Sequence, residues 1–282
     1  MTLKTRTQWI EWGRKELERA GTQQPLAEAE FLLAASLKTS RTRVLAFSSE
    51  PVPQKEAETF CFFIDQKRQG LPVSYITGET DFCTLTLRSD QRALAPRPET
   101  EELVEYCAKL FEKGANPRIL DLCTGSGCIA LALAAKFPRA HVTAVDISAE
   151  ALSLAAENAR LCKLQDKVCF LQSDLFAEVN GSFDLIVSNP PYIPTSQLEE
   201  LSIEVQQEPR LALDGGEDGL AVIGQIARLA ADYLNPHGVL ALEIGQGEVD
   251  AVCSLFDSSK WEGGIKKDFA GIDRFVFARR KF

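Results

Sequence analysis

A short run of glycines in the middle of the chain has the composition of a ligand-binding turn. Asp121 lies near the end of an apolar stretch, and Gly125 and Gly127 follow it just before an apolar helical run. Glycines at a strand-to-helix turn let the backbone approach a ligand, and the first N–H groups of the helix remain free to bind it. The spacing predicts a strand, a turn and a helix that hold a nucleotide-like cofactor, against the alternative of a turn that serves packing alone.

Two acidic residues bear on the identity of that cofactor. Asp146 stands at the end of the next predicted strand, where a carboxylate accepts hydrogen bonds from both hydroxyls of a ribose. The pattern Gly125-x-Gly127-x-x-Ala130 also fits a dinucleotide site, but Asp121 would repel a pyrophosphate. The same carboxylate suits the ammonium group of an amino-acid tail, which favours S-adenosyl-L-methionine over NAD.

A third predicted strand ends at Asp174 and Leu175. Leu175 is placed to pack on an adenine base. Asp174 either lies near the adenine amino group or caps the following helix, and the sequence leaves both interpretations open.

The tetrapeptide Asn189-Pro190-Pro191-Tyr192 ends a fourth predicted strand. Its prolines fix φ and remove two N–H donors, which leaves backbone carbonyls free to accept hydrogen bonds. Asn189 adds a side-chain carbonyl, and the Tyr192 ring can cover a flat group. Such acceptors suit an –NH₂ on a planar carbon, because they can turn its delocalised lone pair toward a methyl donor; catalysis is then mostly positioning. The alternative is a proline-rich turn without chemical meaning.

After Pro98 the predicted elements alternate between strand and helix. Nearly all-apolar strands with helices between them indicate an α/β fold, in which helices cover both faces of a parallel sheet. Residues 270–273 alone separate the last two strands, and so short a connection makes an antiparallel pair. We therefore predict a Rossmann-like, mostly parallel sheet with one reversed strand near its edge. The strands are predicted at 118–122, 141–145, 168–172, 185–188, 239–244, 265–269 and 274–278.

The first part of the chain has helical periodicity instead. Pro25 opens an apolar stripe at helical spacing, Ser40 can cap a short helix, and Gly21 and Gly70 stand where helices end. Alternating residues at 83–87, a turn at 89–91 and a returning strand at 92–95 predict a hairpin. The expected organisation is a helical domain over 1–70, a hairpin linker over 71–95 and a catalytic domain over 96–282.

Composition and charge exclude several classes of protein. Hydrophobic residues at 45% and charged residues at 25% are globular averages, and the longest apolar run, 129–135, is too short to span a bilayer. Residues 1–20 alternate charged and apolar types, which does not predict a signal segment, so we expect a soluble, cytoplasmic protein without a membrane partner. The net charge is −9, with +2 on residues 1–70, which argues against a stable nucleic-acid partner.

The cysteines predict neither a metal site nor a disulfide framework. The eight cysteines include no Cys-x-x-Cys pair, and His141 and His237 are the two histidines. Cys107 and Cys169 fall in apolar periodic segments, so we expect them to be reduced core residues.

The glycine turn and the Asn-Pro-Pro-Tyr motif, with their spacing, resemble the amino-group methyltransferases that use S-adenosyl-L-methionine. Further motifs narrow this resemblance: residues 75–82 (YITGETDF), 94–101 (LAPRPETE), 204–205 (EV) and 208–220 (EPRLALDGGEDGL). With the helical front domain, they look like the release factor glutamine methyltransferase family, also called PrmC/HemK. The match covers essentially the whole chain.

That resemblance implies a fold, a reaction and a partner. The fold would be that of the class I S-adenosyl-L-methionine-dependent methyltransferases with a helical substrate-recognition domain. The reaction would methylate the side-chain nitrogen (N5) of the glutamine in the Gly-Gly-Gln motif of class 1 peptide-chain release factors. Its products would be N5-methylglutamine and S-adenosyl-L-homocysteine.

The resemblance also assigns residues. The cofactor would be bound by Asp121, Leu122, Cys123, Thr124, Gly125, Asp146, Leu175 and Asn189. The glutamine amide would be bound by Asn189, Pro190, Pro191 and Tyr192, with Asn189, Pro190 and Tyr192 as the catalytic residues. Residues 97–101 would close over the site, although Pro98 or Thr100 can equally start a helix.

Some positions depart from the family pattern. Cys123 stands where glycine is frequent, and Ala95 replaces a larger aliphatic residue. Leu175 stands where an aromatic residue can occur, so we expect weaker adenine stacking. None of these positions belongs to the amide-binding tetrapeptide.

Residues 193–220 show little periodicity before Gly219, and so long a loop beside an active site is usually functional. We expect it to clamp the substrate loop. Three alternative functions remain from the sequence: glutamine methylation of a ribosomal protein, amino-group methylation of a nucleic-acid base, and an NAD-binding module without catalysis.

Overall fold

The structure is a computed structural model that describes residues 4–281. The chain divides into two compact units. Unit 1 comprises Met1–Gly78 and Ser202–Gln207, and unit 2 comprises Glu79–Leu201 and Glu208–Phe282.

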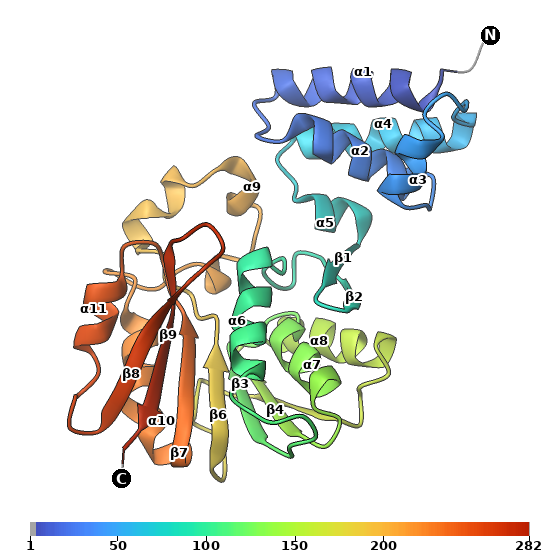
Figure 1. The fold of residues 1–282 in the computed structure, drawn as a ribbon. Coiled ribbons are helices and arrows are strands. Elements are labelled where there is room, and N and C mark those ends of the chain that lie inside the picture. Colours follow the sequence, from blue (N-terminus) through green and yellow to red (C-terminus); the bar gives the residue numbers. More distant parts are fainter. Residues whose placement is uncertain (1–3, 282) are drawn as a thin grey trace. The chain divides into compact units, whose positions relative to one another are not determined.

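Unit 1 is helical, as predicted (Figure 1). Its helices are α1 (Arg6–Arg19), α2 (Pro25–Ser36), α3 (Arg41–Ala46), α4 (Gln54–Arg68), α5 (Val73–Thr77) and α9 (Ile203–Gln206). Pro25 is the first residue of α2, and the Ser40 hydroxyl accepts the Arg43 N–H at the start of α3, which confirms both predicted starts. Gly21, at φ 79°, follows the end of α1.

The core of unit 1 forms where α1 meets α2 and α4. Leu17, Leu33, Phe60 and Ile64 are fully buried there. A Cβ on Gly13 would lie 2.7 Å from the Phe60 ring, so this glycine permits the close approach of α1 and α4.

The segment Ser202–Gln207 belongs to unit 1 although its chain neighbours belong to unit 2. Lys67 Nζ lies 2.6 Å from the Glu204 carboxylate and 3.5 Å from that of Glu28, and the Lys67 side chain is 2% exposed. A Cβ on Gly70 would lie 2.4 Å from Ile203 Cγ2. An ion pair with a buried lysine and a close apolar contact thus attach this segment to the helices.

Unit 2 contains a seven-stranded sheet with the order β5-β4-β3-β6-β7-β9-β8 (Figure 1). The strands are β3 (Arg118–Leu122), β4 (His141–Asp146), β5 (Val168–Gln172), β6 (Phe183–Ser188), β7 (Leu234–Glu243), β8 (Trp261–Lys267) and β9 (Asp273–Arg280). Strand β9 pairs antiparallel with β7 and β8, and the other pairs are parallel. The prediction of one reversed strand near the edge is confirmed.

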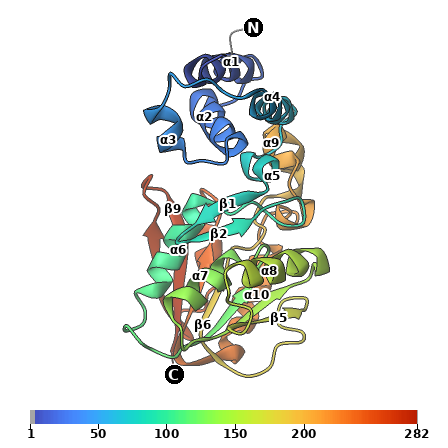
Figure 2. The same ribbon diagram turned by 90° about the vertical axis from the view of Figure 1, so that its right-hand side faces the viewer.

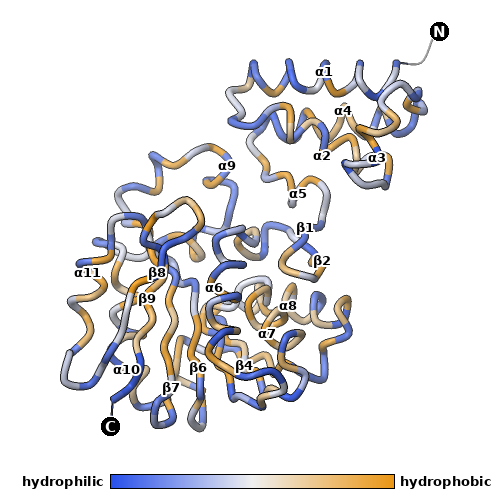
Figure 3. The backbone as a smooth tube through the Cα atoms, viewed as in Figure 1, coloured by the Kyte–Doolittle hydropathy of each residue, from blue (hydrophilic) through white to orange (hydrophobic). Residues whose placement is uncertain are grey.

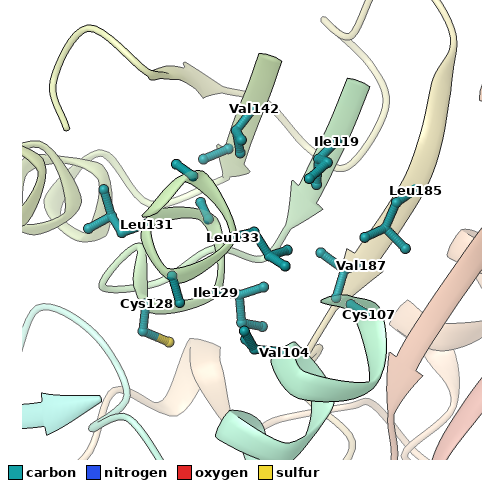
Figure 4. Packing of buried hydrophobic residues seen from close by; sticks show 14 of the residues in the cluster. Val104, Cys107, Ile119, Cys128, Ile129, Leu131, Leu133, Val142, Leu185 and Val187 are labelled. Atoms are coloured by element: carbon teal, nitrogen blue, oxygen red, sulfur yellow. The ribbon is translucent and has the colours of Figure 1, made fainter. Parts of the chain in front are cut away.

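Helices cover both faces of this sheet (Figures 1 and 2). One layer contains α6 (Pro98–Ala108), α7 (Cys128–Lys136) and α8 (Ala149–Leu161), and the other contains α10 (Ala221–Tyr233) and α11 (Val249–Ser254). Successive side chains of a strand point to opposite faces of the sheet. In β6, Leu185 and Val187 pack with α6 and α7, whereas Ile186 packs with α10. Figure 4 shows Val187 and Leu185 beside the side chains of α7, and Figure 3 shows β6 and β7 as largely hydrophobic segments.

The predicted hairpin exists but was assigned to the wrong residues. Its strands are β1 (Glu79–Phe82) and β2 (Leu85–Arg88), joined by a turn at Cys83 and Thr84, and residues 92–95 form no strand. Cys83 takes a φ of 53°, a conformation that asparagine or glycine usually supplies in such turns. Because the turn at Cys83 and Thr84 contains neither, the sequence has no turn signal there, and the alternation of apolar residues predicts a continuous strand.

Two further expectations were wrong. Residues 193–220 contain short helices, namely η1 (Thr195–Glu200), α9 and η2 (Arg210–Ala212), which are too brief to show a period. Cys107 is buried and reduced as predicted, but Cys169 is exposed on β5, the edge strand of the sheet.

Over residues 4–281, no helix is long and apolar enough to cross a membrane. In the same range, no group of three or more His, Cys, Asp or Glu side chains is placed to hold a metal ion.

Candidate active site

The register of three parallel strands brings the sequence motifs to one edge of the sheet. Leu122 of β3 lies opposite Ser188 of β6, and the Ser188 hydroxyl donates to the Leu122 carbonyl at 2.7 Å. On the other side of β3, Leu122 lies opposite Val145 of β4. The residues that follow these strands therefore emerge side by side, at the point where the strand order reverses and ligands bind in such sheets.

A cavity opens at this edge, and all the residues that line it belong to unit 2. The predicted site residues in its wall are Cys123, Thr124, Gly125, Asp146, Leu175, Asn189 and Pro191. Four predicted residues are outside the wall: Asp121, Leu122, Pro190 and Tyr192. Asp174 and residues of the 92–97 segment also line the cavity.

The glycine turn and Asp146 hold each other in place. The Gly125 N–H donates to Asp146 Oδ2 at 2.8 Å, and the Ser148 N–H donates to Oδ1 at 2.9 Å. Gly125 and Gly127 have φ values of 56° and 81°, which favour glycine. Burial raises the pKa of the Asp146 carboxyl, and the backbone donors oppose that shift. The two backbone N–H groups thus orient the Asp146 carboxylate at the cavity wall.

Cys123 shares the left-handed conformation of the turn, with a φ of 57°. Burial raises the pKa of its thiol, so Cys123 stays protonated and is not a reactive thiolate.

Asp121 is fully buried beneath the glycine turn with an incomplete set of partners. Its Oδ2 accepts the Thr124 hydroxyl at 2.5 Å and the Ala130 N–H at 3.1 Å. Its Oδ1 is buried and has no hydrogen-bond partner within residues 4–281. Burial raises the pKa of the carboxyl to about 7. A nearby cation would stabilise the ionised form of such an acceptor, so Asp121 is compatible with an ammonium group bound at the cavity wall, although Asp121 does not itself line the cavity.

At the other end of the cavity, Asn189 belongs to a hydrogen-bond chain with Thr100 and Glu243. The Asn189 Nδ2 donates to the Thr100 hydroxyl oxygen at 3.2 Å, and the Thr100 hydroxyl donates to Glu243 Oε2 at 2.8 Å. Thr100 and Glu243 are each 2% exposed. Burial raises the pKa of Glu243 to about 7.

Sequence reasoning missed Glu243 and left Thr100 as a possible helix start. Pro98 takes that role as the first residue of α6, and Thr100 lies in its first turn. The signal for Glu243 was present, because an acidic residue follows the apolar run 239–242 at the end of its strand, and Asp146 likewise ends a strand.

Tyr192 packs into the hydrophobic cluster beneath α10. Burial raises the pKa of its phenol to about 12, so Tyr192 stays protonated and is not a general base at neutral pH. Two glycines of the 193–220 region lie close to the backbone of Tyr192. A Cβ on Gly215 would lie 2.8 Å from the Tyr192 Cα, and a Cβ on Gly219 would lie 2.4 Å from the Tyr192 carbonyl oxygen.

The same region supplies part of the cavity wall through Pro209, Leu211 and Ala212. Glu208, which is 4% exposed, fixes this wall because it accepts the Ala95 N–H at 2.9 Å and pairs with Arg97. Arg97 and Thr100 also line the cavity, so the 97–101 stretch starts a helix and borders the site at once.

Comparisons with known proteins identify the relatives of this chain. The PrmC N-terminal domain family matches residues 8–78, and the Methyltransferase small domain family matches residues 105–216. A release factor glutamine methyltransferase of Deinococcus radiodurans is 41% identical over 265 residues, which is 94% of each chain. One from Moorella thermoacetica is 40% identical over 270 residues, 95% of each chain.

Among solved structures, a methyltransferase from Pyrococcus furiosus has a TM-score of 0.53 and 22% sequence identity, covering 70% of this chain and 89% of its own. At that identity the likeness shows the fold alone, a methyltransferase fold with a mostly parallel sheet.

Proposed function

The chain belongs to the release factor glutamine methyltransferase family, and from that premise we propose that it methylates the side-chain nitrogen (N5) of the glutamine in the Gly-Gly-Gln motif of class 1 release factors. The methyl donor is S-adenosyl-L-methionine, and the second product is S-adenosyl-L-homocysteine. The observation that carries the proposal is that Asn189 and Asp146, from two separate motifs, line one cavity.

The cofactor end of the site is assigned to the glycine turn and its acidic neighbours. Asp146 would bind the ribose hydroxyls, Leu175 would contact the adenine, and Asp121 would stabilise the ammonium of the amino-acid tail. The backbone of Thr124 and Gly125 would border that tail, with Leu122 and Cys123 completing the turn. The cofactor supplies an electrophilic methyl group on a sulfonium.

The amide end is assigned to the tetrapeptide. The Asn189 carbonyl oxygen would accept one N–H of the glutamine amide, and carbonyls at Pro190 and Pro191 would accept the other. With both N–H bonds held, the nitrogen lone pair is directed toward the methyl group. The nitrogen gains the methyl group and releases one proton to solvent, without a strong base; a protonated Tyr192 agrees with this.

The remaining parts of the chain would recognise the protein substrate. The helical domain over residues 1–70 would bind the release factor, and residues 193–220 would clamp its Gly-Gly-Gln loop. The excess of acidic residues, with a net charge of −9, supports a protein substrate over a nucleic acid. The expected place of action is the cytoplasm.

Methyl transfer to a purified release factor tests the proposal. The protein is incubated with labelled S-adenosyl-L-methionine and the release factor, and the label is located by peptide mass spectrometry. A release factor with Gln→Ala in its Gly-Gly-Gln motif is the control. We expect label on that glutamine and none in the control.

Two outcomes contradict the proposal. Label on another residue, or none despite cofactor binding, would move the assignment to a ribosomal-protein glutamine or a nucleic-acid base. Binding of NAD without binding of S-adenosyl-L-homocysteine would overturn the cofactor assignment as well.

Limited proteolysis tests the clamp. Binding of substrate is expected to protect residues 193–220 from cleavage, whereas equal cleavage with and without substrate would reject a clamping role.

A further inference from the structure

We propose that Glu243 and Thr100 are positioning residues, which fix the Asn189 side chain so that its carbonyl oxygen, and not its –NH₂, faces the bound glutamine. The inference rests on the proposed function, because it concerns how Asn189 receives an amide substrate.

The direction of the hydrogen bonds leads to this inference. A threonine hydroxyl has a single hydrogen, and in Thr100 that hydrogen is donated to Glu243 Oε2. Only lone pairs of the hydroxyl oxygen then remain for Asn189, so Asn189 must present its –NH₂, as it does at 3.2 Å. Because the two arms of an amide diverge, Oδ1 is left for the cavity that Asn189 lines.

An ionised carboxylate at position 243 sets this direction because it accepts hydrogen bonds and cannot donate them. A neutral amide there could donate its –NH₂ to Thr100. The Thr100 hydrogen would then be free to bind Asn189 Oδ1, and the Asn189 –NH₂ would turn toward the substrate. Two –NH₂ groups would face each other, and the substrate nitrogen would lose its acceptor.

Burial strengthens the preference for this direction of the hydrogen bonds. Thr100 and Glu243 are each 2% exposed, so water does not offer either side chain an alternative partner. The charged and titratable groups that interact with Glu243 include Arg274 of β9, Arg97 and Glu99 at the start of α6, Tyr192 after β6 and the Cys128 thiol of α7. The two arginines favour the carboxylate, whereas Glu99 and burial oppose it.

A structural role for the same pair would lower stability and leave the chemical step unchanged, and kinetics separate the two roles. We would measure kcat and KM for the release factor, the S-adenosyl-L-homocysteine affinity by calorimetry and the melting temperature. The variants are Glu243→Gln, Thr100→Val and the conservative Thr100→Ser, which retains the hydroxyl.

We expect Glu243→Gln and Thr100→Val to lower kcat by about 10- to 100-fold while cofactor affinity stays within about threefold. Thr100→Ser should keep kcat within about threefold. At saturating S-adenosyl-L-methionine, where cofactor affinity does not limit turnover, wild-type kcat should fall as pH drops below about 7, because Glu243 then takes up a proton, and Glu243→Gln should lack that dependence. Unchanged kcat in folded Glu243→Gln would overturn the proposal.

Double variants test the proposal independently if one of the single variants folds poorly. If Glu243 acts through Asn189, Glu243→Gln should lower kcat no further in an Asn189→Ala background, and Thr100→Val should behave likewise. A second, full loss of kcat in that background would contradict positioning through Asn189.

Failure of this inference is distinguishable from failure of the proposed function. If the wild type does not methylate the glutamine, the proposed function fails. If it does and the Glu243 and Thr100 variants match it, only the positioning role fails.

Discussion

The two ends of the cavity are built in different ways. At the cofactor end the contacts join residues that are near in sequence: Asp121 bonds to Thr124 and Ala130 within its own strand–turn–helix unit, and the Gly125–Asp146 bond spans 21 positions. At the amide end, Thr100, Asn189 and Glu243 come from α6, the end of β6 and β7, and 143 positions separate Thr100 from Glu243. A local change should therefore affect cofactor binding in a limited way, whereas the amide end depends on how three distant elements pack.

The largest difference between the ends is expected from Asn189→Ala. Removal of the amide acceptor should lower turnover by about 100-fold or more, and S-adenosyl-L-homocysteine affinity should stay within about tenfold. Steady-state kinetics and calorimetry on the same preparation measure both. Equal losses in turnover and affinity would mean that the tetrapeptide supports cofactor binding instead.

Gly219→Ala tests whether the amide end depends on packing. Gly219 has a φ of 80°, and an added Cβ would meet the Tyr192 carbonyl oxygen at 2.4 Å, so the tetrapeptide must move. We expect turnover to fall by about tenfold.

Gly247→Ala is the matched control, since Gly247 has a φ of 86° and open space around its Cβ position. Both variants carry a backbone strain of about 1 kcal/mol, but only Gly219→Ala should lose turnover. Similar kinetics for the two variants would refute a role for the close contact.

Cofactor binding should report the protonation of Asp121. Its pKa of about 7 means that the neutral form prevails at pH 6, and a bound ammonium favours the ionised form. Affinity for S-adenosyl-L-homocysteine should therefore rise about fivefold from pH 6 to pH 7, with a proton released on binding. Calorimetry in two buffers measures both quantities.

In Asp121→Asn the increase in S-adenosyl-L-homocysteine affinity from pH 6 to pH 7 should be smaller. The remaining increase would come from Asp146, because burial raises the pKa of that carboxyl too. An equal rise in the variant and the wild type would exclude Asp121 as the titrating group.

Leu175→Ala should give the smallest effect. Leu175 is 9% exposed in the cavity wall, and removal of its side chain should weaken cofactor binding by about threefold to tenfold through lost apolar contact. Turnover at saturating cofactor should not change. Leu161→Ala, at a site 52% exposed and outside the cavity wall, is the control and should bind as the wild type does.

The contrast between the two ends also explains what the sequence could predict. The strands that carry Asp121, Asp146 and Asn189 were predicted because apolar runs and turn residues are local signals. The Thr100–Glu243 contact was not, because it depends on where helix α6 packs against strand β7, far away in the sequence. The position of the turn between β1 and β2 was predicted wrongly, because Cys83 takes the left-handed conformation that glycine or asparagine usually adopts in such a turn.

Unit 1 is completed by a segment made much later than its helices, and this has a consequence for biosynthesis. Its first five helices, α1 to α5, are synthesised by residue 77, but Glu204, the nearer partner of buried Lys67, emerges only after about three quarters of the chain. Until then the Lys67 ammonium has the Glu28 carboxylate, 3.5 Å away in the finished fold, as its acidic partner. The helices of unit 1 are therefore complete as a unit only after residues 202–207 have been synthesised. A truncated chain that ends before residue 202 would contain these helices but would lack the Lys67–Glu204 ion pair.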